Sequence, residues 1–153
     1  PLDQKLFFGD LQNVGTAVKF YEELIIKYDD PNKKFNFLSH LFLLYSGYNG
    51  SDFGYKNFTE SGRDYMSDKD SEKKVIDILS QMESYVNGEN DTNFSLLVQC
   101  YYLWGVRRSN SKIFSGKVKV NKKSKPYFEK VIELTENNKN NIYSIFSEHW
   151  LSK

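Results

Sequence analysis

The sequence has few cysteines, histidines and long apolar runs, and each shortage excludes a class of protein. One cysteine, Cys100, leaves no internal disulfide framework and no cysteine-rich zinc site. No stretch approaches the roughly 18–20 uninterrupted apolar residues of a membrane helix. The first residues, PLDQKLFFGDLQ, lack the basic start and apolar run of a signal peptide, so none is expected here. The HExxH, CxxC, GxGxxG and GxxxxGKS/T patterns of metal and phosphate sites are absent.

Aromatic residues, by contrast, are abundant, and the charges balance. Twelve Phe, eleven Tyr and two Trp supply ample apolar surface for a core, which argues against disorder. Lys and Arg number 21 against 20 Asp and Glu, a net charge of +1. At 153 residues one domain is the usual outcome. We therefore expect a single helical domain over residues 1–153.

Apolar residues recur every three to four positions along most of the chain, which is typical of helices. This spacing predicts helices over 14–28, from Asp30-Pro31 to about Gly47, from Asp70 or Ser71 to Asn87-Gly88, over 93–107 after Thr92, over 126–136, and over 139–151. The helix after Pro31 is apolar on most of its faces and should be the central one. The last helix presents Ile142, Ile145, Phe146, Trp150 and Leu151.

Two segments depart from the helical pattern. Residues 46–70 contain four glycines, and a short helix around 52–65 is expected there because structureless loops of this length are uncommon. Val118 and Val120 alternate with lysines, which indicates a short strand or hairpin near 112–121. The predicted fold class is thus all-α, a compact single-domain bundle of six or seven helices.

The strongest charge feature is the stretch 107–125, which has no acidic residue and eight basic ones: Arg107, Arg108, Lys112, Lys117, Lys119, Lys122, Lys123 and Lys125. Stretch 52–91 carries an excess of acids. One interpretation is a basic arm that attracts nucleic acid, an anionic surface or an acidic protein face. The other is a solvated loop beside the chain's own acidic stretch. Lysine reads neither bases nor phosphates bidentately, which weakens the nucleic-acid interpretation.

An aromatic cluster runs directly into this basic stretch. Tyr101, Tyr102 and Trp104 precede Arg107 and Arg108. Tyr, Trp and Arg are the residue types that anchor protein interfaces, so the cluster is a candidate binding surface. The alternative is a core helix with one tyrosine at its rim.

Catalysis has little support in the sequence. His40, His149 and Cys100 are the only candidates for a base and a nucleophile, and none of them is adjacent to another in sequence. Cys100 lies within the apolar run LLVQCYYLW, where a thiol is usually inert core filling. We expect no enzyme, no metal and no cofactor, and a hydrolase or transferase built on these three residues is the least favoured class.

Two resemblances concern about fifty residues in the C-terminal part of the chain. LLVQCYYLWG followed by SKPYFEKVIEL resembles a tetratricopeptide helix pair, although Gly105 and Phe128 are separated by more residues than the repeat allows and no second copy appears at its period. With NNIYSIF opening the last helix, the same stretch is similar to the C-terminal half of poxvirus Bcl-2-like proteins. The cellular family's Asn-Trp-Gly-Arg signature is absent. Both resemblances imply a helical adaptor.

The expected function is a non-enzymatic protein–protein interaction module. It would dock a partner through the aromatic residues Tyr101, Tyr102 and Trp104, with Arg107, Arg108, Lys117, Lys119, Lys122 and Lys123 steering the encounter. The alternative is a nucleic-acid or anionic-surface binder that uses the 107–125 segment. Four N-x-S/T sequons, at Asn49, Asn57, Asn90 and Asn93, leave a secreted origin open beside a cytoplasmic one.

Overall fold

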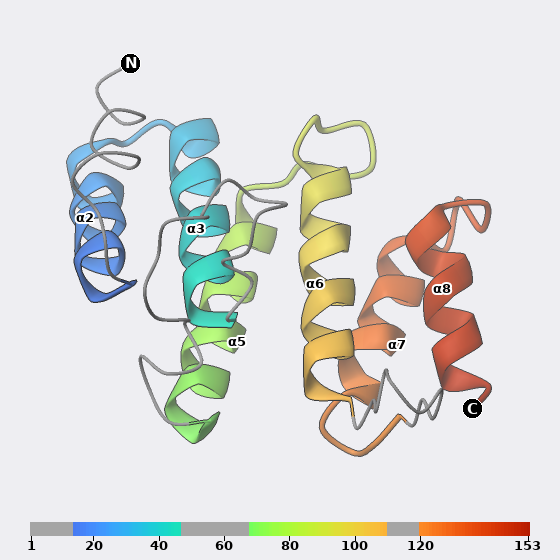
Figure 1. The fold of residues 1–153 in the computed structure, drawn as a ribbon. Helices are drawn as coiled ribbons and strands as arrows, with labels where there is room; N and C mark the ends of the chain where they lie inside the picture. The colour runs from blue at the N-terminus through green and yellow to red at the C-terminus, as the bar shows by residue number, and fades with distance from the viewer. Residues whose placement is uncertain (1–13, 47–67, 110–119) are drawn as a thin grey trace. The chain divides into compact units, whose positions relative to one another are not determined.

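The computed structural model describes residues 14–46, 68–109 and 120–153 and is all-α (Figure 1). These ranges contain six helices and no strand, which confirms the predicted fold class. The chain divides into two compact units, Pro1–Tyr85 and Val86–Lys153. We describe each by itself, and the single domain over 1–153 stays a prediction. The helix expected around 52–65, and the strand near 112–121 except for its last two residues, lie outside the described residues.

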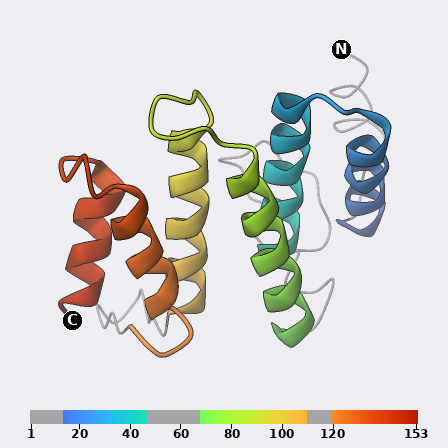
Figure 2. The same ribbon diagram turned by 180° about the vertical axis from the view of Figure 1, so that it is seen from behind.

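The first unit is built on its central helix. It contains α2 (Val14–Lys27), α3 (Pro31–Ser46) and α5 (Asp68–Ser84). Both α2 and α5 pack against α3, which lies between them in the two opposite views (Figure 1, Figure 2). The apolar side chains of α3 are almost completely buried: Phe35, Leu38, Leu41, Phe42 and Leu44. The helix that is apolar on most of its faces is therefore the central one of this unit, as its sequence predicts.

Local chemistry explains where these helices begin. A carboxylate oxygen of Asp30 accepts a hydrogen bond from the backbone N–H of Asn32 at 2.9 Å, and Pro31 occupies the first helical position, where no N–H is needed. The predicted start of α3 is confirmed. Helix α5 begins at Asp68, ahead of the predicted cap, and ends at Ser84. Gly88, with φ +82°, lies in the turn beyond it, where a left-handed backbone favours glycine.

The second unit contains α6 (Phe94–Arg108), α7 (Lys125–Leu134) and α8 (Ile142–Leu151). Helix α7 packs against both neighbours, and α6 also touches α8 (Figure 1). The completely buried ring of Phe128, on α7, stands edge-on to Tyr102 of α6 at 5.9 Å between centroids. It stacks on Trp150 of α8 at 5.4 Å and 12°. One ring of α7 thus contacts both other helices of the unit.

Side-chain caps set the turns of this unit. Asp91, rather than the predicted Thr92, precedes α6 as the organising residue, because its carboxylate accepts from the backbone N–H groups of Asn87 and Asn93 at 2.9 Å each. Asn121 and Ser124 form reciprocal bonds before α7, at 2.9 and 3.0 Å, in the manner of a capping box. The amide of Asn121 also donates to the carbonyl of Arg108 at 3.0 Å. The start of α7 is therefore tied to the end of α6.

Helix α8 does not pack through its largest aliphatic side chains. Ser144 and Ser147 are buried, whereas Ile142, Ile145 and Phe146 are 55%, 51% and 41% exposed. At about 100° per residue, Ile142 and Ile145 lie on the side of the helix opposite Ser147, and Phe146 lies beside them toward the packed side. Most of the apolar residues whose spacing predicts α8 therefore form a stripe that faces solvent.

Gly105 provides a test of the packing between α6 and α7. A Cβ atom there would lie 3.0, 3.1 and 3.2 Å from three carbons of the Phe128 ring. The ring is held on its other sides, so we expect Gly105→Ala to lower the free energy of unfolding by about 1 kcal/mol, despite the gain of about 1 kcal/mol that alanine brings to a helix. Urea unfolding measures the difference.

The matched control is the same substitution in a Phe128→Leu background. The smaller side chain gives the new methyl group room, so Gly105→Ala should there raise the free energy of unfolding. A stabilising effect in both backgrounds would show that the close approach of Gly105 and Phe128 does not constrain the two helices.

Candidate functional site

Two of the three residues considered for catalysis, Cys100 and His40, are buried in environments that disfavour their charged forms. Cys100 is buried in α6, and burial raises the pKa of its thiol, which keeps it protonated. His40 stacks on Tyr21 at 4.8 Å and 4°, and burial lowers its pKa to about 4. His149 is exposed near the end of α8.

The described residues were also compared with what a metal site and a membrane-spanning helix require. Within these ranges no three His, Cys, Asp or Glu side chains group closely enough to hold a metal ion. No helix among them is both long and apolar enough to cross a membrane. Three surfaces are formed by the described residues.

The predicted aromatic cluster is mostly interior. Tyr101 is 8% exposed and Trp104 is 2% exposed, so both side chains pack within the chain. Tyr102 is half-buried, and its hydroxyl accepts a hydrogen bond from the indole N–H of Trp150 at 3.1 Å. This matches the alternative of a core helix with one tyrosine at its rim.

Beside Tyr102 lies the first surface, the α8 stripe, which we define as Ile142, Ile145 and Phe146. The ring of Phe146 lies 5.8 Å from that of Tyr102, so the stripe continues the aromatic packing outward. Tyr143 lies 5.4 Å from Tyr102 on the inner side, and partial burial raises its pKa. The sequence feature that could have indicated this exposed stripe is the pair of small polar residues, Ser144 and Ser147, on the packed side of α8.

The second surface is the basic end, defined as Arg107, Arg108, Lys122, Lys123 and Lys125. The bond from Asn121 to Arg108 brings the last turn of α6 and the start of α7 together. The chain leaves α8 at this same end of the unit (Figure 1, Figure 2). Lys122 and Lys123 are exposed, and the guanidinium of Arg108 lies 5.5 Å from the Trp104 ring centroid. Lys117 and Lys119 lie outside the described residues.

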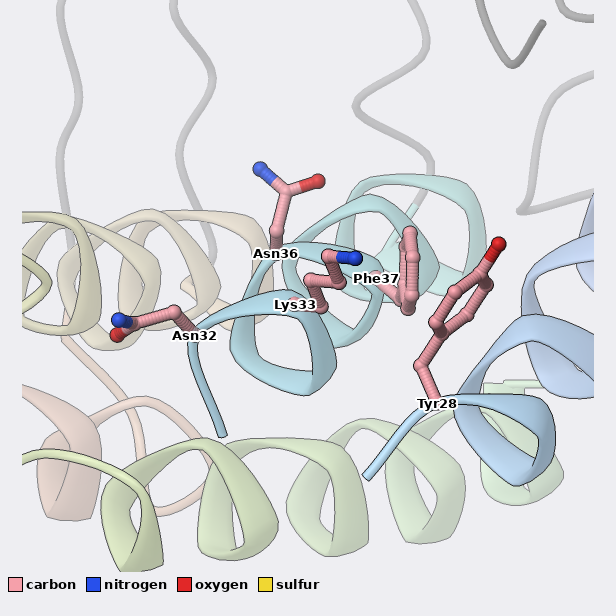
Figure 3. A pocket seen from close by; sticks show the side chains of 5 residues that line it. All are labelled: Tyr28, Asn32, Lys33, Asn36 and Phe37. Atoms are coloured by element: carbon pink, nitrogen blue, oxygen red, sulfur yellow. The ribbon is translucent and has the colours of Figure 1, made fainter. Parts of the chain in front are cut away.

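The third surface is a pocket that sequence reasoning missed, at the corner between α2 and α3 in the first unit. It has a volume of about 310 Å³ and is lined by Tyr28, Asn32, Lys33, Asn36 and Phe37 (Figure 3). The ammonium of Lys33 lies 4.6 Å from the centroid of the Tyr28 ring. In the sequence, this pocket is indicated only by the polar residues in the first turns of α3, which is otherwise apolar.

Comparison with protein-family models, with curated proteins and with solved structures finds no match to this chain. The tetratricopeptide and Bcl-2-like resemblances stay predictions. Function has to be argued from the three surfaces themselves.

His40 gives the chain a defined response to acid. The unfolded chain takes up a proton at His40 near its ordinary pKa of 6.5, whereas the folded chain does so only near pH 4. Neutral, buried His40 therefore contributes fully to the free energy of unfolding above pH 6.5. This contribution is lost as the pH falls from 6.5 toward 4, and the loss is at most about 3 kcal/mol.

We expect His40→Phe, which keeps a ring stacked on Tyr21, to lose less stability than the parent chain between pH 7 and pH 4.5. Urea unfolding at both pH values measures this difference, with His149→Phe as the exposed control. Equal losses in the parent and in His40→Phe would contradict the buried, neutral state of His40.

Proposed function

We propose that this chain is a non-enzymatic protein-interaction module whose second unit docks an amphipathic helix with acidic side chains. The α8 stripe is the observation that carries the proposal. Isolated exposed apolar residues are common on protein surfaces, but three large ones on neighbouring turns of one helix mark an interaction site. The burial of Cys100 and the depressed pKa of His40 support a binding role over catalysis.

The shape of the stripe supports a helix as the occupant. Ile142, Ile145 and Phe146 follow one side of a helix at the i, i+3 and i+4 positions. A ridge of this kind fits the groove between the side-chain rows of another helix. Three side chains, each about half exposed, supply much less than the roughly 800 Å² per partner of a stable dimer, which argues against a second copy of this chain.

The charge of the basic end supports acidic residues on that partner. A helix that lies along α8 would bring one of its ends to the basic end. Lys122 and Lys123 precede α7, whose positive dipole end adds to their charge. Complementary charge would accelerate the encounter, while the stripe would supply the affinity.

A second candidate function is the binding of nucleic acid by the basic end. The gathering of Arg107 and Arg108 with Lys122 and Lys123 from a separate segment favours it. The exposed members with defined positions are lysines, which attract phosphates as point charges without sequence readout. This candidate predicts binding to unrelated sequences that weakens steeply with salt.

The first test removes one side chain of the stripe. The probe is a synthetic 20-residue amphipathic helix with leucines on one face and glutamates on the other. We expect Ile145→Ser to raise its Kd about tenfold, because a central apolar contact is lost, and to leave the melting temperature nearly unchanged. Fluorescence anisotropy measures the binding.

The matched control is Ile76→Ser, an equally exposed isoleucine on α5 in the other unit. Equal binding by the parent chain and Ile145→Ser would contradict the docking surface. Self-association in sedimentation that Ile145→Ser abolishes would instead identify a second copy as the occupant.

The second test reverses two charges of the basic end. We expect the double substitution Lys122→Glu and Lys123→Glu to slow association with the acidic helix and to reduce its salt dependence. The same variant should unfold at higher temperature, because acidic residues at the start of α7 complement its dipole by about 0.3–1 kcal/mol each. Stopped-flow mixing and thermal unfolding measure the two effects.

Lys73→Glu, an exposed change on α5, is the matched control. An unchanged rate and salt slope in the double variant would contradict the steering role. Salt-sensitive binding of a labelled 20-nucleotide oligothymidine by the parent chain, lost in the double variant, would favour the nucleic-acid candidate instead.

A further inference from the structure

The turn that precedes α6 contains an asparagine followed by a glycine, Asn87-Gly88, and both residues are exposed. An asparagine side chain is chemically labile, because the backbone nitrogen of the next residue can attack the carbon of its amide group. Glycine favours this attack, since it has no Cβ atom to crowd the nitrogen. A Cβ atom placed on Gly88 would meet no other atom within 4 Å, so the space around this residue is open.

The two groups that react in such an attack carry no hydrogen bond among the described residues. The backbone N–H of Asn87 donates to the carboxylate of Asp91 at 2.9 Å, which anchors the main chain of residue 87. No hydrogen bond in the described ranges engages the carboxamide of Asn87 or the N–H of Gly88. The amide carbon and the attacking nitrogen are therefore both available for reaction.

The two other asparagines of this turn differ from Asn87 in the nitrogen that follows them. Asn90 is exposed, but the next N–H, that of Asp91, donates to the carbonyl of Gly88 at 3.1 Å. Asn93 is followed by Phe94, whose N–H donates to the carbonyl of Asp91 at 3.1 Å. Each of these nitrogens would have to break a hydrogen bond of the turn before it could attack. Asn87 is therefore the reactive asparagine of the three.

We propose that Asn87 is a modification site, which is converted in the folded chain to aspartate and isoaspartate without an enzyme. Hydroxide removes the proton from the nitrogen of Gly88, and this nitrogen bonds to the side-chain carbonyl carbon of Asn87. The amide nitrogen of Asn87 takes up a proton and leaves as ammonia, so that a five-membered succinimide remains. Water then opens the ring. Cleavage between the Gly88 nitrogen and the side-chain carbon gives aspartate, and cleavage between that nitrogen and the main-chain carbon gives isoaspartate.

The new carboxylate weakens the turn that precedes α6. The carboxylate of Asp91 accepts from the N–H groups of Asn87 and Asn93 at 2.9 Å each, and these bonds lower its pKa. A second negative charge on residue 87 repels the charge of Asp91. Isoaspartate also lengthens the backbone between these two residues by one carbon, which displaces the donor from the acceptor. The site does not depend on the α8 stripe or on the function proposed for it.

The test ages the full, folded chain at 37 °C, at pH 8 and at pH 5. Digestion with pepsin in acid, which avoids further reaction, and mass spectrometry then locate the change. We expect a mass gain of about 1 Da at Asn87 that accumulates at least about tenfold faster at pH 8 than at pH 5, and at least about tenfold faster than at Asn90. An isoaspartyl methyltransferase with labelled S-adenosylmethionine should mark the same peptide.

Two variants separate the chemistry from the stability of the turn. Asn87→Gln keeps a carboxamide and the N–H bond to Asp91, but its cyclisation requires a six-membered ring, so we expect no mass gain at residue 87. Asn87→Asp represents the product, and we expect it to unfold at a lower urea concentration than the parent chain at pH 7. In an Asp91→Asn background the same substitution should shift the midpoint much less, because the second charge is absent.

Three results of the ageing experiment would overturn the proposal. The first is a mass gain at Asn87 no faster than that at Asn90. The second is an equal rate at pH 5 and pH 8, because the Gly88 nitrogen must lose its proton. The third is a gain in the urea-unfolded chain but not in the folded one, because the fold would then protect the site. Equal urea midpoints for Asn87→Asp and the parent chain would contradict the weakening of the turn.

Discussion

The packing of Phe128 against Gly105 is the contact on which the second unit depends. Because residue 105 has no side chain, the ring lies so close to α6 that a Cβ atom there would be only 3.0–3.2 Å from three of its carbons. The same ring meets Tyr102 edge-on and Trp150 face to face. The position of one buried ring thus defines the distance from α6 to α7 and the rotation of α8.

That rotation has consequences for the surface. Trp150 faces inward to stack on Phe128 and to donate to the hydroxyl of Tyr102. Ser147 lies on the same side of α8, and its hydroxyl is buried with no hydrogen-bond partner among the described residues, which costs stability. The isoleucines lie on the opposite side. Burial of the most apolar surface alone would have turned α8 the other way, so its orientation follows from the aromatic contact.

Both units place cations beside aromatic rings, but in different chemical settings. In the second unit the basic end is assembled from two segments, and Arg108 lies against the buried Trp104. In the first unit Lys33 reaches over the ring of Tyr28 at the edge of a pocket.

The sequence by itself determined the helical class and most helix positions. Periodic apolar residues and the Asp30-Pro31 start predicted α2 and α3 within a residue at each end, because these signals are local. It also located the basic residues, although their meeting required the bond between Asn121 and Arg108.

Only the tertiary structure decided which aromatic side chains are interior and which apolar side chains are exposed. A period of 3.6 defines the faces of a helix but not which face meets its neighbour. Tyr101 and Trp104 went inward and the α8 stripe outward because the close approach at Gly105 and the ring of Phe128 fixed the helix rotations. The pocket at Tyr28 and Lys33 was equally hidden from the sequence, since it exists only where the ends of two helices meet in space.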